Sequence, residues 1–266
     1  MKSSKRTLLW RLSSPAAPAD SFLFGTMHVR DRRAFGALDA VYKAIEYCET
    51  FAAETDLNQF GATANFSAFQ LPEGKTLDQL LPIKKYEKLR RIIRKAMQID
   101  IEKLRYFQPI IIANLIDESL LMKDMPFSLD QHLWRYAEQH GKKTIGIETP
   151  AEQMQILLSI PLDYQLKALL SIGRQPAKHR QALLKAAEWY EQARIDQLYR
   201  STKRSLHGLR RLMLYDRNQR MARRIAVMME AQSTFAAIGA AHLWGEQGVL
   251  KLLKNDGFVV KARNEA

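Results

Sequence analysis

The sequence is poor in cysteine and lacks long hydrophobic runs. Cys48 is the only cysteine among 266 residues, so the chain cannot form an intrachain disulfide or a cluster of thiolate metal ligands. No stretch approaches the roughly 18 consecutive apolar residues of a membrane-spanning helix. The apolar stretch that follows the basic N-terminus, at 8–12, contains Arg11 and is too short for a signal peptide. We therefore expect a cytoplasmic protein, with the periplasm or a membrane surface as alternatives.

The sequence also lacks several well-known catalytic motifs and has fewer acidic than basic residues. The sequence has no GxSxG, Walker A or GxGxxG pattern, which weighs against serine hydrolases, P-loop enzymes and Rossmann dehydrogenases. There are 28 acidic residues against 41 Lys and Arg, a formal net charge of +13. Such a charge favours anionic partners. Because no homeodomain, zinc-finger or RNP-type motif is present, we expect no specific nucleic-acid binding and interpret the basic helices as solvated surface.

One motif is present twice. The segments SFLFGTMH, which ends at His28, and TFAAIGAAH, which ends at His242, are short apolar runs followed by Gly-x-x-His. Such runs are typical of buried strands. Gly25 and Gly239 predict a sharp backbone turn and a close approach by another chain or ligand. The two histidines would lie at the carboxyl ends of strands, the edge at which open α/β sheets bind ligands.

Six segments have the pattern of strands and are separated by helical blocks. The predicted strands are residues 7–13, 21–26, 50–56, 142–150, 234–240 and 257–262. The first two are expected to pair as a hairpin. We also expect a loop over 58–74 and a helix over 244–255. The pattern predicts a single α/β domain over residues 1–266, with large helical insertions at about 76–140 and 151–230.

Four predicted strands end in a polar side chain: His28, Glu54, Glu148 and His242. If these strands are parallel neighbours, the four side chains meet at one sheet edge. Two imidazoles and a carboxylate suit Zn, Mn, Fe or Co. A metal there would lower the pKa of a bound water and polarise a carbonyl. The remaining carboxylate would act as a general base or orient a histidine.

Each of these residues also has a structural interpretation. A histidine after glycine at a strand end is often a hydrogen-bonded loop residue, and Glu54 and Glu148 could be charges stabilised at helix N-termini. Arg217 could hold an oxyanion or a substrate carboxylate, or pair with a carboxylate that ties its helix to the core. The other histidines lack paired spacing and are interpreted as surface or packing residues: His132, His140, His179 and His207.

Segments along nearly the whole chain carry a family resemblance. They are LFGTMH ending at His28, AAETD containing Glu54, LPEGKTLDQLL at 71–81, SLDQHLWRYAEQHGKKTIGIETPAEQ at 128–153, DRNQRMARRI at 216–225 and GAAHLWGEQGVLKLLKNDGF at 239–258. In this order they resemble the TraB/PrgY/GumN family, the bacterial relatives of the Tiki metalloproteases. The resemblance implies an α/β fold similar to erythromycin esterase and ChaN-like proteins. Its central sheet would consist of two related halves, each ending in Gly-x-x-His.

The resemblance also implies a divalent-metal hydrolase, using Mn, Co, Zn or Fe, with peptide cleavage as the activity of the Tiki branch. By this resemblance, the metal ligands of this chain would be His28, Glu54 and His242. Further recurrent polar positions are Glu148, Arg217, Asn218 and Asp130. The chain departs from the family in two ways. Ala241 stands where glycine is usual, and no export signal or membrane segment is evident where many members have one.

These residues and the resemblance are compatible with three functions. The first is a peptidase-like hydrolase in which metal-activated water attacks a carbonyl, Glu148 or Glu54 acts as the base, and Arg217 and Asn218 hold the substrate or oxyanion. The alternative is a protein that binds and sequesters a peptide or small ligand in the same pocket without turnover. The third treats the basic helices as a nucleic-acid or anionic-membrane surface whose affinity falls steeply with salt.

Overall fold

The computed structural model describes residues 6–62 and 69–263. The chain divides into two compact units, each formed by separate stretches of sequence. Unit 1 comprises Met1–Ala62, Lys123–Gln153 and Ala186–Ala266, and unit 2 comprises Thr63–Met122 and Met154–Lys185. Each unit has a hydrophobic core of its own. The single-domain organisation with helical insertions, and the two related halves of the sheet, stay predictions.

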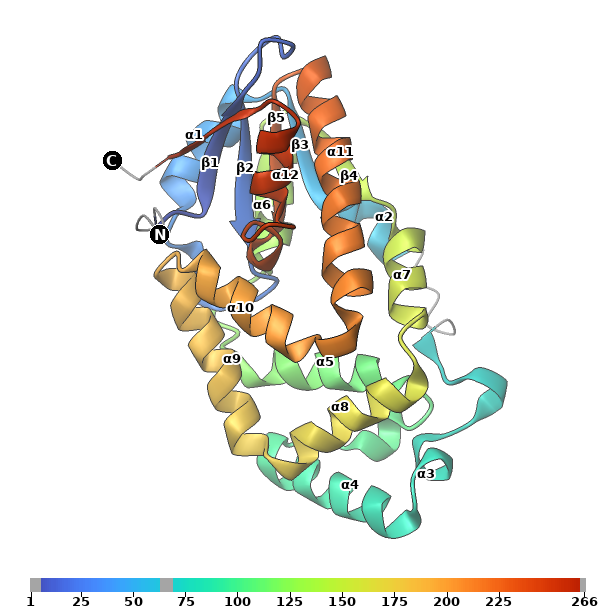
Figure 1. The fold of residues 1–266 in the computed structure, drawn as a ribbon. Coiled ribbons are helices and arrows are strands. Elements are labelled where there is room, and N and C mark those ends of the chain that lie inside the picture. Colours follow the sequence, from blue (N-terminus) through green and yellow to red (C-terminus); the bar gives the residue numbers. More distant parts are fainter. Residues whose placement is uncertain (1–5, 63–68, 264–266) are drawn as a thin grey trace. The chain divides into compact units, whose positions relative to one another are not determined.

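All six expected strands are present in unit 1, where they form one mixed sheet (Figure 1). They are β1 Leu9–Ser13, β2 Ser21–Thr26, β3 Thr50–Thr55, β4 Lys143–Glu148, β5 Thr234–Gly239 and β6 Val259–Ala262. The order across the sheet is β4-β3-β5-β2-β1-β6. β1 pairs antiparallel with β2, as predicted, and with β6. β4, β3, β5 and β2 are parallel neighbours, so their carboxyl ends share one edge. The predicted α/β class is confirmed.

The central strands are buried on both faces, which explains their uninterrupted apolar runs. Every residue of β2 and β3 is buried, as expected when helices cover both sides of a parallel sheet. Helices α11 and α12 lie over one face, and α1 and α6 over the other (Figure 1). Phe51 and Phe235, paired in register on β3 and β5, stack with ring centroids 5.6 Å apart. This packing fixes the strands whose ends carry the polar side chains.

The helices of unit 1 connect and cover these strands. They are α1 Leu38–Tyr47, α2 Leu57–Ala62, α6 Leu129–Gln139, α10 Ile195–Ser205, α11 Asp216–Ala231 and α12 Val249–Asn255, with 3-10 turns at Arg32–Phe35, His207–Leu209 and Ala240–His242 and a π-helical turn at Arg211–Tyr215. Two further helices, α7 Pro150–Leu158 and α9 Pro176–Glu191, contain the unit boundaries. Ser128 caps α6 in a capping box with Gln131, which places Asp130 in the first turn of that helix.

Two sequence expectations are wrong. The loop expected over 58–74 contains α2 and a 3-10 turn at Pro72–Gly74, and residues 63–68 lie outside the described part. Asp56 starts α2 because its carboxylate accepts the N–H groups of Asn58 and Gln59. The helix expected from 244 begins only at Val249, because Gly245 has a φ of +99° and Gly248, directly before the helix, has an extended backbone with ψ of 150°, both outside the helical range.

The described part of unit 2 consists mainly of helices. They are α3 Leu77–Leu80, α4 Ile83–Met97, α5 Pro109–Leu120 and α8 Leu162–Arg174, with parts of α7 and α9 and a 3-10 turn at Ile101–Leu104. α5 begins with a proline at its first position, where the missing N–H is not needed. Each long helix packs one apolar face into the core of unit 2. The core includes Ile93 of α4, Ile112 of α5 and Leu169 of α8.

No single helix within residues 6–62 and 69–263 is both long enough and apolar enough to cross a membrane. The consecutive helices α7 and α8 meet the length and hydropathy criteria only as a pair, with a bend of 82° between them.

Candidate functional site at the sheet edge

The shared edge of the four parallel strands brings the predicted site residues together. Glu54 is the penultimate residue of β3 and Glu148 the last residue of β4, while His28 and His242 follow β2 and β5. The Nε2 atoms of His28 and His242 lie 4.0 and 3.9 Å from the same atom, Glu54 Oε1. Arg217 joins the two carboxylates, since its Nη2 is 2.9 Å from Glu54 Oε2 and 2.6 Å from Glu148 Oε2. The four strand ends and Arg217 therefore form one cluster.

The glycines of the repeated motif allow close packing at this edge. The backbone N–H of Gly239 donates to Glu54 Oε1 at 2.6 Å, and a Cβ at that position would lie only 3.1 Å from this oxygen. A Cβ at Gly25 would lie 2.6 Å from Leu243 Cδ1. Neither glycine has a positive φ. The expected close approach is therefore present, whereas a sharp turn that only glycine can adopt is not.

A second residue orients each imidazole through its Nδ1 atom. His242 Nδ1 is 2.5 Å from Asn218 Oδ1, and Asn218 Nδ2 donates to the Gln247 carbonyl at 2.6 Å. The latter bond fixes which end of the amide faces the ring, so His242 carries its proton on Nδ1 and leaves Nε2 as an acceptor. His28 Nδ1 is 2.8 Å from Asp130 Oδ2, an ion-pair contact that is not aligned as a hydrogen bond. Both rings therefore present Nε2 toward Glu54, the arrangement found around metal-bound histidines.

Asp130 is itself held in place by the strand that precedes His28. Its Oδ1 accepts a hydrogen bond from Thr26 Oγ1 at 2.7 Å. Both residues are buried, whereas 58% of the His28 side chain is exposed. Asp130 thus ties the first turn of α6 to the end of β2, and solvent reaches the cluster at His28.

The charges of the cluster are set by burial and by each other. Burial lowers the pKa of His242 to about 4, so this ring is neutral at pH 7. Burial alone would raise the pKa of Glu54, but His242, Arg217 and His28 together lower it to about 2. Asp130 raises the pKa of His28 to about 9; its exposure lets solvent screen part of this effect. Glu54 is therefore a carboxylate throughout the physiological range.

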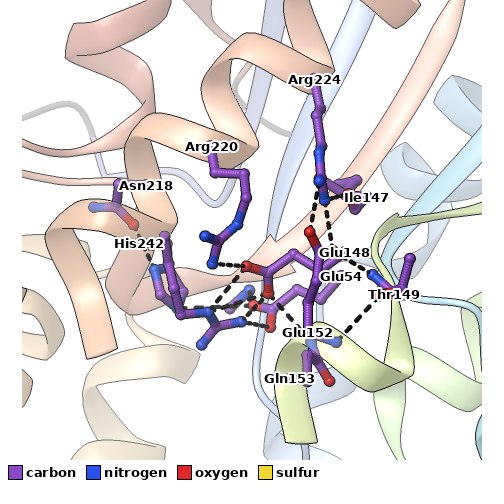
Figure 2. Close-up of polar contacts among 12 residues, drawn as sticks. Glu54, Ile147, Glu148, Thr149, Glu152, Gln153, Asn218, Arg220, Arg224 and His242 are labelled. Atoms are coloured by element: carbon purple, nitrogen blue, oxygen red, sulfur yellow. Dashed lines mark hydrogen bonds and ion pairs between the residues drawn. The ribbon is translucent and has the colours of Figure 1, made fainter. Parts of the chain in front are cut away.

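Glu148 lies at the centre of an arginine network (Figure 2). Its side chain is fully excluded from solvent and accepts from Arg217 and, at 3.1 Å, from Arg220 Nη2. Arg224 forms a two-pronged pair with Glu152 at 2.8 and 2.7 Å. Glu148 is therefore a buried ion-pair partner rather than a solvated charge at a helix N-terminus, and Arg217 makes the carboxylate pairing that was one of its two interpretations.

Sequence reasoning missed two of these arginines. Arg220 and Arg224 follow Arg217 by three and seven residues, so they share one face of α11. This spacing was visible in the sequence. The buried carboxylates that the face meets were not, because their position depends on the sheet order.

The donor types fit a divalent metal. As they stand, no three His, Cys, Asp or Glu side chains in the described residues form a group that could hold a metal ion. Two donors bonded to one ion at about 2.0–2.2 Å can be at most about 4.4 Å apart. The distances from Glu54 Oε1 to the two Nε2 atoms lie within that limit. The chemistry of the donor set fits, and its spacing is wider than that of a closed coordination sphere.

The other histidines have packing or surface environments. His132 lies 2.5 Å from the Tyr42 hydroxyl, His179 is 2.6 Å from Asp117 in unit 2, and His207 is exposed.

A sequence model of the TraB/PrgY/gumN family matches residues 8–262. The chain belongs to this family. Among curated relatives, it is 24% identical to "Metalloprotease TIKI2" of Danio rerio over 313 residues, which cover 96% of this chain and 60% of the relative. It is 25% identical to "Metalloprotease TIKI homolog" of Amphimedon queenslandica over 327 residues, covering 97% and 61%. This TraB/PrgY/gumN chain thus spans about three fifths of the length of both relatives. No solved structure matches it.

Proposed function

We propose that the chain is a metal-dependent hydrolase that cleaves a peptide or a related carbonyl substrate. His28, Glu54 and His242 would hold one divalent ion of Mn, Co, Zn or Fe. The observation that carries this proposal is the convergence of two Nε2 atoms on one oxygen of Glu54, with both Nδ1 atoms held by other residues. The names of both curated relatives, which contain the word metalloprotease, support it.

The ligand roles follow from the protonation states. A bound metal would supply a water of lowered pKa and a polarised carbonyl. Glu54 remains charged because its pKa is about 2, which suits a ligand better than a general base. His242 is neutral at pH 7, the form that binds metals. His28, whose pKa Asp130 raises to about 9, would have to release a proton on binding the ion, so metal affinity should rise with pH. Asp130 and Asn218 position the two rings through Nδ1.

The remaining expected site residues fit positioning roles. Asn218 is fully buried and uses both ends of its amide within the chain, so we assign it to holding His242 rather than to contact with substrate. Glu148 has no solvent exposure and bonds two arginines, so we assign it to holding Arg217 and Arg220. Arg217 in turn binds Glu54 Oε2 and leaves Oε1 facing the imidazoles.

The proposal is tested by metal content. Protein purified without chelator or an affinity metal is measured by plasma mass spectrometry, as wild type and as the single variants His28→Ala, His242→Ala and His207→Ala. We expect near-stoichiometric metal in wild type and in the His207 variant, since His207 is exposed and lies outside the cluster. Both site variants should lose the metal. Unchanged metal in either site variant would disprove the ligand assignment.

A second candidate is a pocket that binds a peptide or small ligand without turnover. One observation favours it: Glu54 already bonds the Gly239 N–H through Oε1 and Arg217 through Oε2, so its charge is compensated within the protein. This function predicts saturable ligand binding with no product, even when Mn, Co or Zn is supplied to the protein.

A further inference from the structure

Helix α4 of unit 2 carries a row of positive charge on the side opposite its buried face. Tyr86, Leu89 and Ile93 pack into the core of unit 2. The opposite side presents four exposed residues in steps of four, three and four along the helix, which places them on one line. This α4 basic row consists of Lys84, Lys88, Arg91 and Lys95.

The side chains of the row are not neutralised within the described chain. On α4 the ion pairs are made by Arg90, which lies 3.8 Å from each of Glu87, Asp100 and Glu102. No side chain of the row forms an ion pair or hydrogen bond with any residue in 6–62 or 69–263. Like charges three and four residues apart on a helix repel one another. An external anionic partner would relieve this repulsion.

The surface beside the row is hollowed. A groove of about 420 Å³ is lined by Glu87, Arg90, Arg91, Arg94 and Lys95. Arg90 is paired with Glu87, which leaves Arg91, Arg94 and Lys95 as the basic side chains of this groove for a phosphate-bearing group. At the N-terminal end of the row, next to Lys84, the apolar side chain of Ile83 is 64% exposed.

We propose that the α4 basic row docks unit 2 on a lipid bilayer with anionic headgroups. The row is straight and about 17 Å long, and the buried opposite face leaves one side of the helix free to lie along a plane. Ile83 is exposed one residue before Lys84 but about 100° around the helix from it, so it flanks the row rather than lying on its line. The aromatic residue of α4, Tyr86, is buried, so its exposed face lacks the stacking platform that single-stranded nucleic acids use.

This proposal does not depend on the proposed function, because it uses no residue of the sheet edge. Attraction of this kind acts over roughly a Debye length, about 10 Å at 0.1 M salt. Binding should therefore require anionic lipid and weaken with added salt.

The test is flotation of the full chain with phosphatidylcholine vesicles that contain either no phosphatidylserine or about 30% of it. We expect binding only to the anionic vesicles, and a loss of about tenfold or more between roughly 0.05 and 0.5 M salt. The double variant Lys88→Glu/Arg91→Glu should bind about tenfold more weakly. Lys251→Glu/Lys254→Glu on α12 is the matched control, since both residues are exposed at the same spacing. Its affinity should change less than about twofold.

Three results would overturn the proposal: no binding to anionic vesicles, equal losses in both double variants, or tighter binding to a duplex oligonucleotide that the α4 variant abolishes. Equal losses would mean that net charge alone matters, and oligonucleotide binding would assign the row to nucleic acid. Circular dichroism checks that each variant keeps its helix content. Lys88→Gln/Arg91→Gln, which keeps helix propensity, should weaken vesicle binding in the same direction.

Discussion

The two units place their charged side chains in opposite ways. At the sheet edge of unit 1, Glu148 has no exposure and Arg217 has 12%, and the two are paired. On α4 of unit 2, the basic row is exposed and has no partner in the described chain. A buried charge has lost its hydration and is tolerated only with its partners, whereas an exposed charge keeps its hydration and gains little from a pair. The pairing of Glu148 with Arg217 is therefore needed for the stability of unit 1, whereas the α4 basic row of unit 2 is available to a partner outside the chain.

Removing a buried partner should have the largest effect on stability. Glu148→Gln deletes the charge that compensates Arg217 and Arg220 but keeps the side-chain volume. Losing one member of a buried pair costs about 3–5 kcal/mol. Because Arg217 keeps Glu54, we expect the lower end, about 3 kcal/mol, in the free energy of unfolding from urea titration.

The matched control for this variant is Glu152→Gln. Glu152 pairs with Arg224 as Glu148 pairs with Arg217, but its side chain is 29% exposed. Solvent screening should limit the loss to about 1 kcal/mol or less. If the two variants lost the same free energy, burial would not be the cause, and the contrast between buried and exposed charges would fail.

The residues that orient the imidazoles should affect metal binding. Loss of a partner that holds a metal-bound histidine typically lowers affinity about 10–100-fold. We expect this loss for Asp130→Asn, measured by competition with a chelator, and a similar loss for Asn218→Ala. Asp39→Asn is the control, because Asp39 is an exposed carboxylate on α1. Unchanged affinity in Asp130→Asn, with metal still bound, would remove Asp130 from the site.

The imidazole of His132 is partly buried, intermediate in exposure between the fully buried Glu148 and the exposed basic row of α4. It should make the stability of the protein depend on pH. Burial lowers the pKa of His132 below its usual 6.5. The unfolded chain then binds a proton at a higher pH than the folded chain, so the free energy of unfolding falls as pH drops below about 6.5. This one group can contribute at most about 1.4 kcal/mol per pH unit.

The measurement is urea unfolding of wild type and His132→Gln at about pH 7.5 and 5.5. Wild type should lose more stability over this interval. Equal losses would show that the pKa of His132 does not differ between the folded and unfolded states. The raised pKa of His28 acts in the opposite direction, since its contribution is complete below 6.5 and is lost as pH rises toward 9.

The strands and their shared edge could be predicted because both depend on local pattern. Uninterrupted apolar runs mark strands buried on both faces, and polar residues at or just beyond the carboxyl end of each run then lie at the edge. The meeting of His28, Glu54 and His242 required the additional assumption that the strands are parallel neighbours, which the sheet order confirms.

What the sequence did not reveal depends on contacts between distant residues. Asn218 was expected near a substrate, yet its amide bonds His242, 24 residues away. Asp130 lies 2.8 Å from His28 although 102 residues separate them in the chain. Such pairings follow from how helices pack on the sheet, and no local pattern encodes them. The start of α12 was missed for a different reason. Residues 245 and 248 are both glycine, and the sequence alone does not tell which backbone conformation a glycine adopts.

The smallest change in stability should come from a substitution in the α4 basic row. It should raise the free energy of unfolding, whereas loss of the buried pair should lower it. Lys84 is in the first turn of α4, four residues before Lys88. Lys84→Glu replaces the like-charge pair with Lys88 by an attractive one in the favourable orientation and puts a negative charge at the positive end of the helix dipole, while it places a like charge three residues before Glu87. We expect unit 2 to gain about 0.3–1 kcal/mol of stability, measured by urea unfolding at low salt, and to lose that gain at about 1 M salt as screening increases. Lys84→Gln, which removes the repulsion from Lys88 together with the attraction to Glu87, should gain less. A loss of stability in Lys84→Glu that the added change Glu87→Gln does not reverse would mean that the row has partners within the chain and that its positive charge is structural, as in unit 1.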